Sequence, residues 1–214
     1  MPQARRPYRS SLRAEQARAT RRAVVEAARD LYIQRGYAGT TIDAVAEQAG
    51  VSRKTVFTAA GGKATLLKLA FDWTLAGDDE PVAIADRPEV QQMLQLDDPA
   101  ALLAAWVAMN AAIARRLAAL HHVLVVAADG DADAAALLAT TDEQRVAGAR
   151  AIAARLAAAG GLRPGLGLDE AAAILDVLID PMPYRRLVVL RGWTFEAYAA
   201  HIQQTAVASL LGDV

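Results

Sequence analysis

The sequence predicts an all-α fold in two parts, an N-terminal three-helix helix-turn-helix domain and a larger C-terminal helical domain. Of its 214 residues 51 are alanine, which has the highest helix propensity and little bulk, so closely packed helices are favoured. Apolar residues recur at helical spacing along most of the chain, and no alternating strand pattern is present. The chain has no cysteine, which excludes a disulfide framework and favours a reducing, cytoplasmic location.

The charges divide unevenly along the chain, although the formal net charge is only −1. Residues 1–63 contain 12 Lys and Arg against 5 Asp and Glu, whereas residues 64–214 contain 11 against 19. A basic segment suits a polyanion, and an acidic segment repels one. The N-terminal part is therefore the candidate for binding nucleic acid. The sequence contains no uninterrupted apolar run of about 18 residues, so no membrane span is predicted.

The N-terminal part is expected to contain a basic arm, a three-helix domain over residues 16–62 and a connecting helix. Residues 1–15 have no apolar periodicity, which predicts a flexible arm with the cations Arg5, Arg6 and Arg9. An apolar stripe beginning near residue 16 predicts a first helix that ends at Gly36. Two short helices are expected over residues 42–49 and 53–59. Residues 63–77 contain the predicted connecting helix.

The C-terminal part, residues 78–214, begins where acids and two prolines interrupt any helix between residues 77 and 88. Long helices are expected over residues 99–128 and 134–159, with Thr140 and Thr141 as a candidate break in the second. Residues 160–169 predict a loop. Two further helices are expected over residues 169–179 and 194–211.

Residues 41–58 fit the requirements of a helix-turn-helix. Such a motif needs a small residue where the helices cross, a residue that accepts a left-handed turn, and apolar positions on either side. Ala46 and Gly50 supply the first two. The apolar set is Ile42, Val45, Ala49, Val51 and Val56. A plain helical hairpin would share this pattern, but the surrounding positive charge favours DNA binding.

The candidate DNA-binding residues lie at the starts of the helices and along the second helix of the motif. Arg53 and Lys54 open that helix, where side chains enter the major groove. Thr41 and Ser52 are at helix N-termini, which favour phosphate, although both could be plain caps. The remaining candidates are Thr55, Phe57, Thr58 and Lys63.

Residues 18–70 resemble the N-terminal domain of the TetR family of transcriptional repressors. The resemblance rests on the segment from Gly36 to Thr58, which reads GYAGTTIDAVAEQAGVSRKTVFT, and on a lysine ahead of Leu66 and Leu67. It implies a homodimer that binds a palindromic operator and is released by a small-molecule effector. Residues 77–88 also resemble an actinobacterial branch of the family.

The chain departs from the family pattern in its recognition helix. The family usually continues as Tyr-x-His-Phe, with Tyr and His reaching phosphates, whereas this chain reads Phe57-Thr58-Ala59-Ala60. Two polar contacts to the DNA backbone are therefore missing. Either binding is weak, or Arg53, Lys54 and the basic arm compensate.

The C-terminal part offers candidates for an effector pocket and for a dimer interface. A pocket needs polar groups among apolar walls, and the candidates for its lining are Trp106, Met109, Asn110, His121 or His122, Tyr184 and Trp193. Each could equally belong to an ordinary core. The resemblance implies dimerisation through the last two helices, for which the candidates are Ile174, Leu178, Tyr198, Ile202 and Leu210.

Other classes of function have less support in the sequence. It contains no nucleophile elbow, phosphate-binding loop or HExxH motif, so no catalytic residue, cofactor or metal site is predicted. His121 and His122 are adjacent rather than one helical turn apart, which is poor spacing for a metal. The sequence predicts a ligand-responsive DNA-binding regulator. The alternatives are a DNA-binding protein without ligand response and, less favoured, a helical enzyme.

Overall fold

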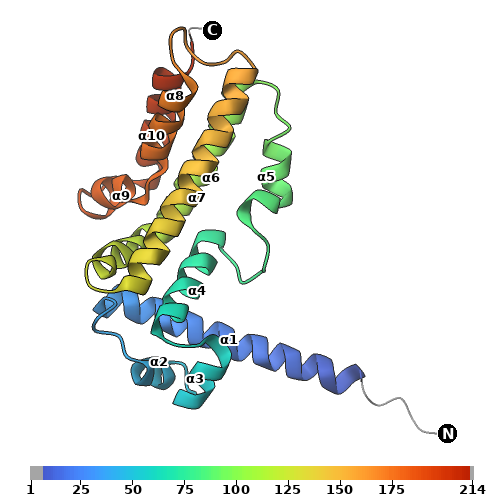
Figure 1. Ribbon diagram of the computed structural model, residues 1–214, viewed down its shortest axis with the longest axis vertical. Coiled ribbons are helices and arrows are strands. Elements are labelled where there is room, and N and C mark those ends of the chain that lie inside the picture. Colours follow the sequence, from blue (N-terminus) through green and yellow to red (C-terminus); the bar gives the residue numbers. More distant parts are fainter. Residues whose placement is uncertain (1–6, 213–214) are drawn as a thin grey trace, which may run out of the picture.

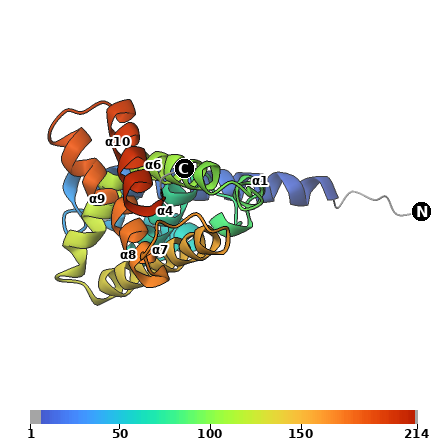
Figure 2. The ribbon, with the colours of Figure 1, turned by 90° about the horizontal axis from the view of Figure 1, so that it is seen from above.

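The computed structural model describes residues 7–212, and these form helices joined by turns and loops (Figure 1). Two long helices, α6 (Pro99–Ala128) and α7 (Ala132–Ala158), run together along the length of the molecule. The four N-terminal helices lie at one end of this pair. Seen from above, α1 crosses beneath the body and projects beyond it toward the N-terminus (Figure 2).

The N-terminal helices are α1 (Pro7–Arg35), α2 (Ile42–Gln48), α3 (Arg53–Ala60) and α4 (Lys63–Ala76). Their apolar faces form one core, in which Tyr32, Leu31, Val45, Val56 and Leu66 are all nearly inaccessible to solvent. The same core includes the C-terminal half of α6. The predicted DNA-binding helices and the predicted C-terminal domain therefore share buried apolar contacts through α4 and α6.

The remaining elements are a short 3₁₀ turn (Ile84–Asp86), α5 (Pro88–Met93), α8 (Leu168–Ile179), α9 (Pro181–Tyr184) and α10 (Phe195–Leu210). A π-helical turn, Arg185–Val189, follows α9. A second core joins α5, the N-terminal half of α6, α7, α8 and α10. An isolated bridge between Leu162 and Leu211 ties the loop after α7 to the end of α10.

The structure corrects three expectations about the elements. First, α1 begins at Pro7 rather than near residue 16, because proline is tolerated in the first helical turn and the following residues can extend the helix. Residues 1–6, with Arg5 and Arg6, lie outside the described residues. Second, α7 is continuous past Thr140 and Thr141, whose hydroxyls donate to carbonyls of the preceding turn. Third, the segment between residues 77 and 88 contains the 3₁₀ turn Ile84–Asp86, and Pro88 at its end starts α5.

The helix α6 is long and apolar enough to cross a membrane by length and composition alone. The same property is expected of a central helix in a protein core. More than half of its most apolar window, 56%, is buried, and it packs against α4, α7, α9 and α10. Its apolar character is therefore accounted for by packing within the chain.

Candidate nucleic-acid interface

The turn between α2 and α3 has the geometry that the sequence predicts. The Thr41 hydroxyl accepts a hydrogen bond from the Ala44 amide at 3.1 Å, and the Ser52 hydroxyl accepts one from the Thr55 amide at 3.1 Å. Gly50 adopts a φ of 66°, in the left-handed region that favours glycine. Ala46 is buried, and its carbonyl accepts from the Val51 amide at 2.9 Å. These contacts fix the direction in which α3 leaves the turn.

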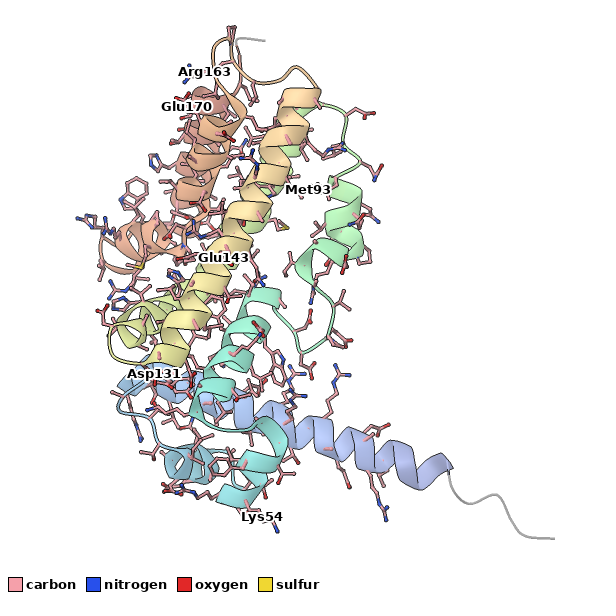
Figure 3. The ribbon with its side chains drawn as sticks, in the orientation of Figure 1. Lys54, Met93, Asp131, Glu143, Arg163 and Glu170 are labelled. Atoms are coloured by element: carbon pink, nitrogen blue, oxygen red, sulfur yellow. The ribbon has the colours of Figure 1, made fainter. Side chains whose placement is uncertain are left out.

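One side of α3 is buried and the other faces solvent. Val56 and Ala60, one turn apart, pack into the N-terminal core, which leaves the opposite arc of the helix exposed. That arc consists of Arg53, Lys54, Phe57 and Thr58. Lys54 projects from the lower end of the molecule, away from the body (Figure 3). The four candidate residues thus form one continuous surface.

The Arg53 side chain contacts one residue of α2 and one residue of α3. Its Nη1 donates to Oδ2 of Asp43 in α2 at 2.7 Å, and both side chains are more than half exposed. Its guanidinium carbon lies 5.7 Å from the centre of the Phe57 ring, one helical turn further along. Sequence reasoning assigned no role to Asp43. Its position at the start of α2, opposite the start of α3, was not marked by any motif.

Lys63 and Thr58 have local partners. The Lys63 ammonium lies 4.3 Å from the centre of the Tyr37 ring, and its carbonyl accepts a hydrogen bond from the Tyr32 hydroxyl at 2.8 Å. Burial raises the pKa of the Tyr37 hydroxyl to about 12. The Thr58 hydroxyl donates to the Lys54 carbonyl at 2.9 Å. Lys63 therefore anchors the start of α4 to α1, and as a residue it is half-buried.

Residues 24–70 match the family model described as bacterial regulatory proteins, tetR family. This span begins within α1, contains the whole α2–α3 motif and ends within α4. The chain carries the DNA-binding domain of the TetR family. The α2–α3 motif is accordingly a helix-turn-helix of the TetR type, with α3 as its second helix.

Solved structures of TetR-type regulators share the fold at low sequence identity, whereas no curated protein matches the chain. A TetR-family transcriptional regulator from Rhodococcus sp. is 18% identical, with a TM-score of 0.65 over 89% of this chain and 98% of that one. A transcriptional regulator from Saccharomonospora viridis, solved with choline, is 18% identical with a TM-score of 0.70 over 90% and 98%. NalD of Pseudomonas aeruginosa, the secondary repressor of the MexAB-OprM multidrug efflux pump, is 18% identical with a TM-score of 0.68 over 92% and 100%. These likenesses show the fold.

The end of α4 is held by arginines from two other parts of this TetR-type chain. Arg116 of α6 donates through Nε to the Thr74 carbonyl at 2.8 Å and through Nη2 to the Leu75 carbonyl at 2.5 Å. Arg87 forms a two-pronged pair with Asp78, at 2.6 and 2.9 Å. This pairing holds the pKa of the Asp78 carboxyl well below its usual range. The last turn of α4 is thus fastened to α6 and to the segment before α5.

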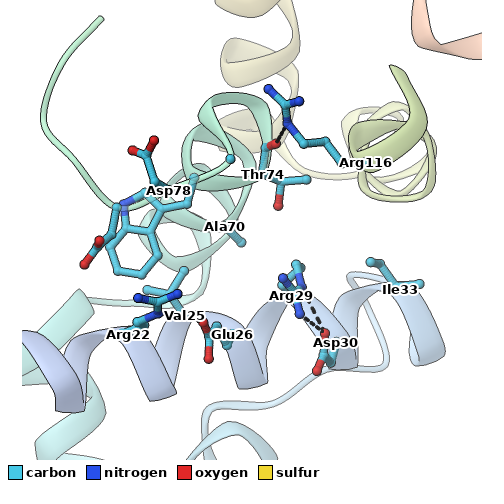
Figure 4. Close-up of a pocket in the computed structure, with 13 residues that line it drawn as sticks. Arg22, Val25, Glu26, Arg29, Asp30, Ile33, Ala70, Thr74, Asp78 and Arg116 are labelled. Carbon is cyan, nitrogen blue, oxygen red and sulfur yellow. Dashed lines mark hydrogen bonds and ion pairs between the residues drawn. The ribbon is translucent and has the colours of Figure 1, made fainter. Parts of the chain in front are cut away.

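A groove of about 430 Å³ lies between α1 and α4, next to Arg116 (Figure 4). Its apolar lining includes Val25, Ala70 and Trp73. Its charged lining comes from α1, from the loop that follows α4 and from Arg116 of α6. Arg29 and Asp30 pair with each other on the α1 side. The groove was not predicted, because its walls belong to segments far apart in the sequence that carry no shared motif.

The predicted effector-pocket residues do not all come together. Trp106 and Tyr184 belong to the C-terminal core, Met109 packs against both cores, and the Asn110 amide donates to the Trp106 carbonyl of its own helix. His121 is buried, with its ring 6.4 Å from Phe71 of α4. The side-chain Nδ1 atoms of His121 and His122 have no hydrogen-bond partner among the described residues.

The predicted pocket residue Trp193 lies at the surface. It is 38% exposed in the loop before α10, with its ring edge-on to His201 at 5.6 Å. The π-helical turn after α9 lets the chain double back before α10, where the Trp193 amide bonds to the Leu187 carbonyl at 3.1 Å. Trp193 is therefore partly open to solvent, whereas Trp106 and Tyr184 are buried.

Three of the predicted dimer residues are also corrected. Tyr198, Ile202 and Leu210 are 1%, 4% and 0% exposed because their stripe on α10 packs into the chain's own core. Buried side chains offer no surface to a second subunit. The other two predicted dimer residues, Ile174 and Leu178, are half-buried on α8. The outward faces carry Val177 on α8, 66% exposed, and Val207 on α10, 40% exposed.

Proposed function

We propose that this TetR-family DNA-binding regulator is a cytoplasmic repressor that a small, largely apolar molecule releases from a palindromic operator. In this proposal residues 16–62 bind DNA, and residues 78–214 bind the effector and dimerise. Residues 63–77 form the helix that connects these two parts. The observation that carries the proposal is the continuous exposed arc of α3, with its two cations, in a part of the chain with a strong excess of positive charge. No enzymatic activity or cofactor is part of it.

The contacts with DNA follow from the positions of the side chains. Arg53, Lys54, Phe57 and Thr58 would enter the major groove, because they occupy the exposed arc of α3. Thr41, Ser52 and Thr55 would lie beside the phosphates at the starts of α2 and α3. The Lys63 ammonium would face the backbone at the edge of the site. Phosphate contacts of this kind make affinity strongly dependent on salt.

A second subunit would be needed for specific binding, because one short helix buries little surface and a two-fold pair reads two half-sites. The surface we propose for the dimer is the outward face of α8 and α10. It is apolar or has small side chains, and its members are Ile174, Val177, Leu178, Ala200 and Val207. Small residues on α10 allow helix axes to approach closely.

The effector would act through α4, which contacts α1, α3 and α6. Phe71 of α4 faces His121, and Arg116 binds the last carbonyls of α4, so a change on α6 would reach the DNA-binding helices. A small tilt of α4 would alter the spacing of two recognition helices. By analogy, the regulator solved with choline supports a role in small-molecule binding, and the efflux-pump repressor NalD supports a role in repression.

The experiment is a titration of DNA affinity with and without compounds that stabilise the protein in a thermal-shift screen. A palindromic duplex is first selected from a random library with the full-length protein. An effector should reduce affinity for this duplex about 5- to 150-fold, which corresponds to a coupling of about 1–3 kcal/mol. Stabilising compounds that leave affinity unchanged would favour a DNA-binding protein without ligand response. Turnover of a bound compound would favour an enzyme.

A further inference from the structure

Phe57 is an unusual member of the exposed arc of α3. Its side chain is 47% exposed, whereas Phe71 is buried in the core. A single exposed ring is common on protein surfaces and by itself indicates nothing. Its place in the arc is informative, because with 100° per residue Phe57 falls between Arg53 and Lys54 on the exposed side. An apolar ring therefore lies between the two cations of the arc.

The polar neighbours of Phe57 are already engaged. Arg53 pairs with Asp43 at 2.7 Å and stands over the Phe57 ring at 5.7 Å. The Thr58 hydroxyl donates its proton to the Lys54 carbonyl at 2.9 Å. Arg53 is thus held between a carboxylate and an aromatic face, and it restricts the ring in turn. An ordered ring loses less conformational entropy when it makes a contact.

The major groove presents one apolar group at the base edges, the 5-methyl group of thymine. Every other distinguishing group there is a hydrogen-bond donor or acceptor, which a phenyl ring cannot satisfy. Covering a cytosine amino group or a guanine carbonyl with the ring would remove water from a polar atom without replacing its hydrogen bond. The ring therefore discriminates in favour of thymine.

We propose that Phe57 is a specificity-determining residue that reads a thymine in each half-site through its 5-methyl group. The proposal rests on the proposed insertion of α3 into the major groove. It adds a base preference at one position beneath the middle of α3. Lys54, which has no ion pair among the side chains of residues 12–212, remains available for a phosphate or a polar base edge.

The test replaces thymine by uracil, which removes the methyl group and leaves the hydrogen-bonding groups in place. Duplexes selected by the full-length protein are synthesised with one symmetric pair of thymines at a time changed to uracil. Burial of one methyl group corresponds to about a fourfold change in affinity, so one symmetric pair should weaken binding about 10- to 20-fold. Uracil at the other pairs should have less than about a twofold effect.

The protein variant Phe57→Ala is combined with the change from thymine to uracil in a double-mutant cycle. It should bind the thymine duplex more weakly and lose no further affinity when the sensitive pair becomes uracil. Because the ring is outside the core, the variant should keep the helical circular dichroism spectrum of the parent. Val146→Ala, which shortens an exposed residue of α7, is the matched control and should retain the full uracil effect.

The outcomes separate this proposal from the proposed function. Selection that yields no enriched duplex would contradict DNA recognition itself. Binding that is unaffected by uracil at every position would overturn the role of Phe57 while leaving DNA binding intact. A uracil effect of equal size in the parent and in Phe57→Ala would also overturn it, because another residue would then be reading the methyl group.

Discussion

The guanidinium of Arg18 in α1 lies 2.7 Å from a carboxylate oxygen of Asp79, in the loop that follows α4. A second hydrogen bond of 2.8 Å makes the pair two-pronged, and Arg18 also binds Glu80 at 2.7 Å. The Asp79 side chain is only 8% exposed. This contact joins the first helix of the DNA-binding part to the end of α4. It therefore restrains the angle between α1 and α4 at the groove they share.

The first prediction is that this pair contributes to acid sensitivity. The Arg18 guanidinium lowers the pKa of the Asp79 carboxyl, so its contribution is present above about pH 4 and is lost as the pH falls through the lower folded pKa. Arg18→Gln should lower the melting temperature slightly at pH 7 and by less at pH 3. Thermal melts at both values check this. Arg13→Gln, an exposed residue of the same helix, is the control, and an equal loss at both pH values would argue against the pair.

The second prediction concerns Asp43 beside the exposed arc of α3. Asp43→Asn should tighten binding to duplex DNA about 3- to 10-fold at low salt and steepen the salt dependence by about one counterion, since a carboxylate is removed and Arg53 is freed. Affinity titrations over a range of salt concentrations measure both effects. In an Arg53→Ala background the change in slope should disappear. Weaker binding by Asp43→Asn alone would mean that Asp43 holds Arg53 in its DNA-binding position.

The third prediction separates the dimer surface from the core. Val177→Arg should give a folded monomer, because this side chain is 66% exposed on the outward face of α8. Ile202→Arg should instead destabilise the fold by about 3–5 kcal/mol, because it places an unpaired charge in the core. Sedimentation velocity and chemical denaturation distinguish the two outcomes. A Val177→Arg protein that remains dimeric, like the Val146→Arg control, would move the interface elsewhere.

The fourth prediction is a loss of stability in mild acid that depends on His121. Burial lowers the pKa of His121 below its usual value, although Asp180 and Asp142 oppose the shift. The unfolded chain therefore binds the proton first, and stability should fall as the pH drops below about 6.5, by at most about 1.4 kcal/mol per pH unit for one proton. His121→Gln should flatten this dependence between pH 7 and 5.5. The exposed His201→Gln variant should leave it unchanged, and an equally steep dependence in both variants would exclude His121.

Most element boundaries could be predicted from local signals. The apolar stripe over residues 63–76 and the proline at position 99 predicted the bounds of α4 and α6 correctly, because capping residues and apolar periodicity act over a few positions. The α2–α3 motif was located by Ala46 and Gly50 in the same way. The extension of α1 to Pro7 was missed because arginines and serines in an exposed helix carry no apolar stripe.

The long-range relationships could not be predicted. The apolar stripe of α10 identified an amphipathic helix, but the sequence does not say whether Ile202 packs inside its own subunit or against a second one. The structure places the stronger stripe in the core, which leaves Val207 and small residues outside. The pairs Arg18–Asp79 and Arg53–Asp43 likewise depend on how helices pack. Charged residues have many available partners in a sequence, and the packing of the helices decides which of them come within reach.

The central claim is that the exposed arc of α3 reads DNA, and a titration of the selected duplex tests it most directly. The parent and an Arg53→Ala/Lys54→Ala double variant are compared at the same salt concentration, with melting temperature as the check on folding. The double variant should lose about 1–3 kcal/mol of binding free energy for each true base contact. Equal affinity of the parent and the folded double variant for this duplex would contradict the assignment of α3 as the recognition helix.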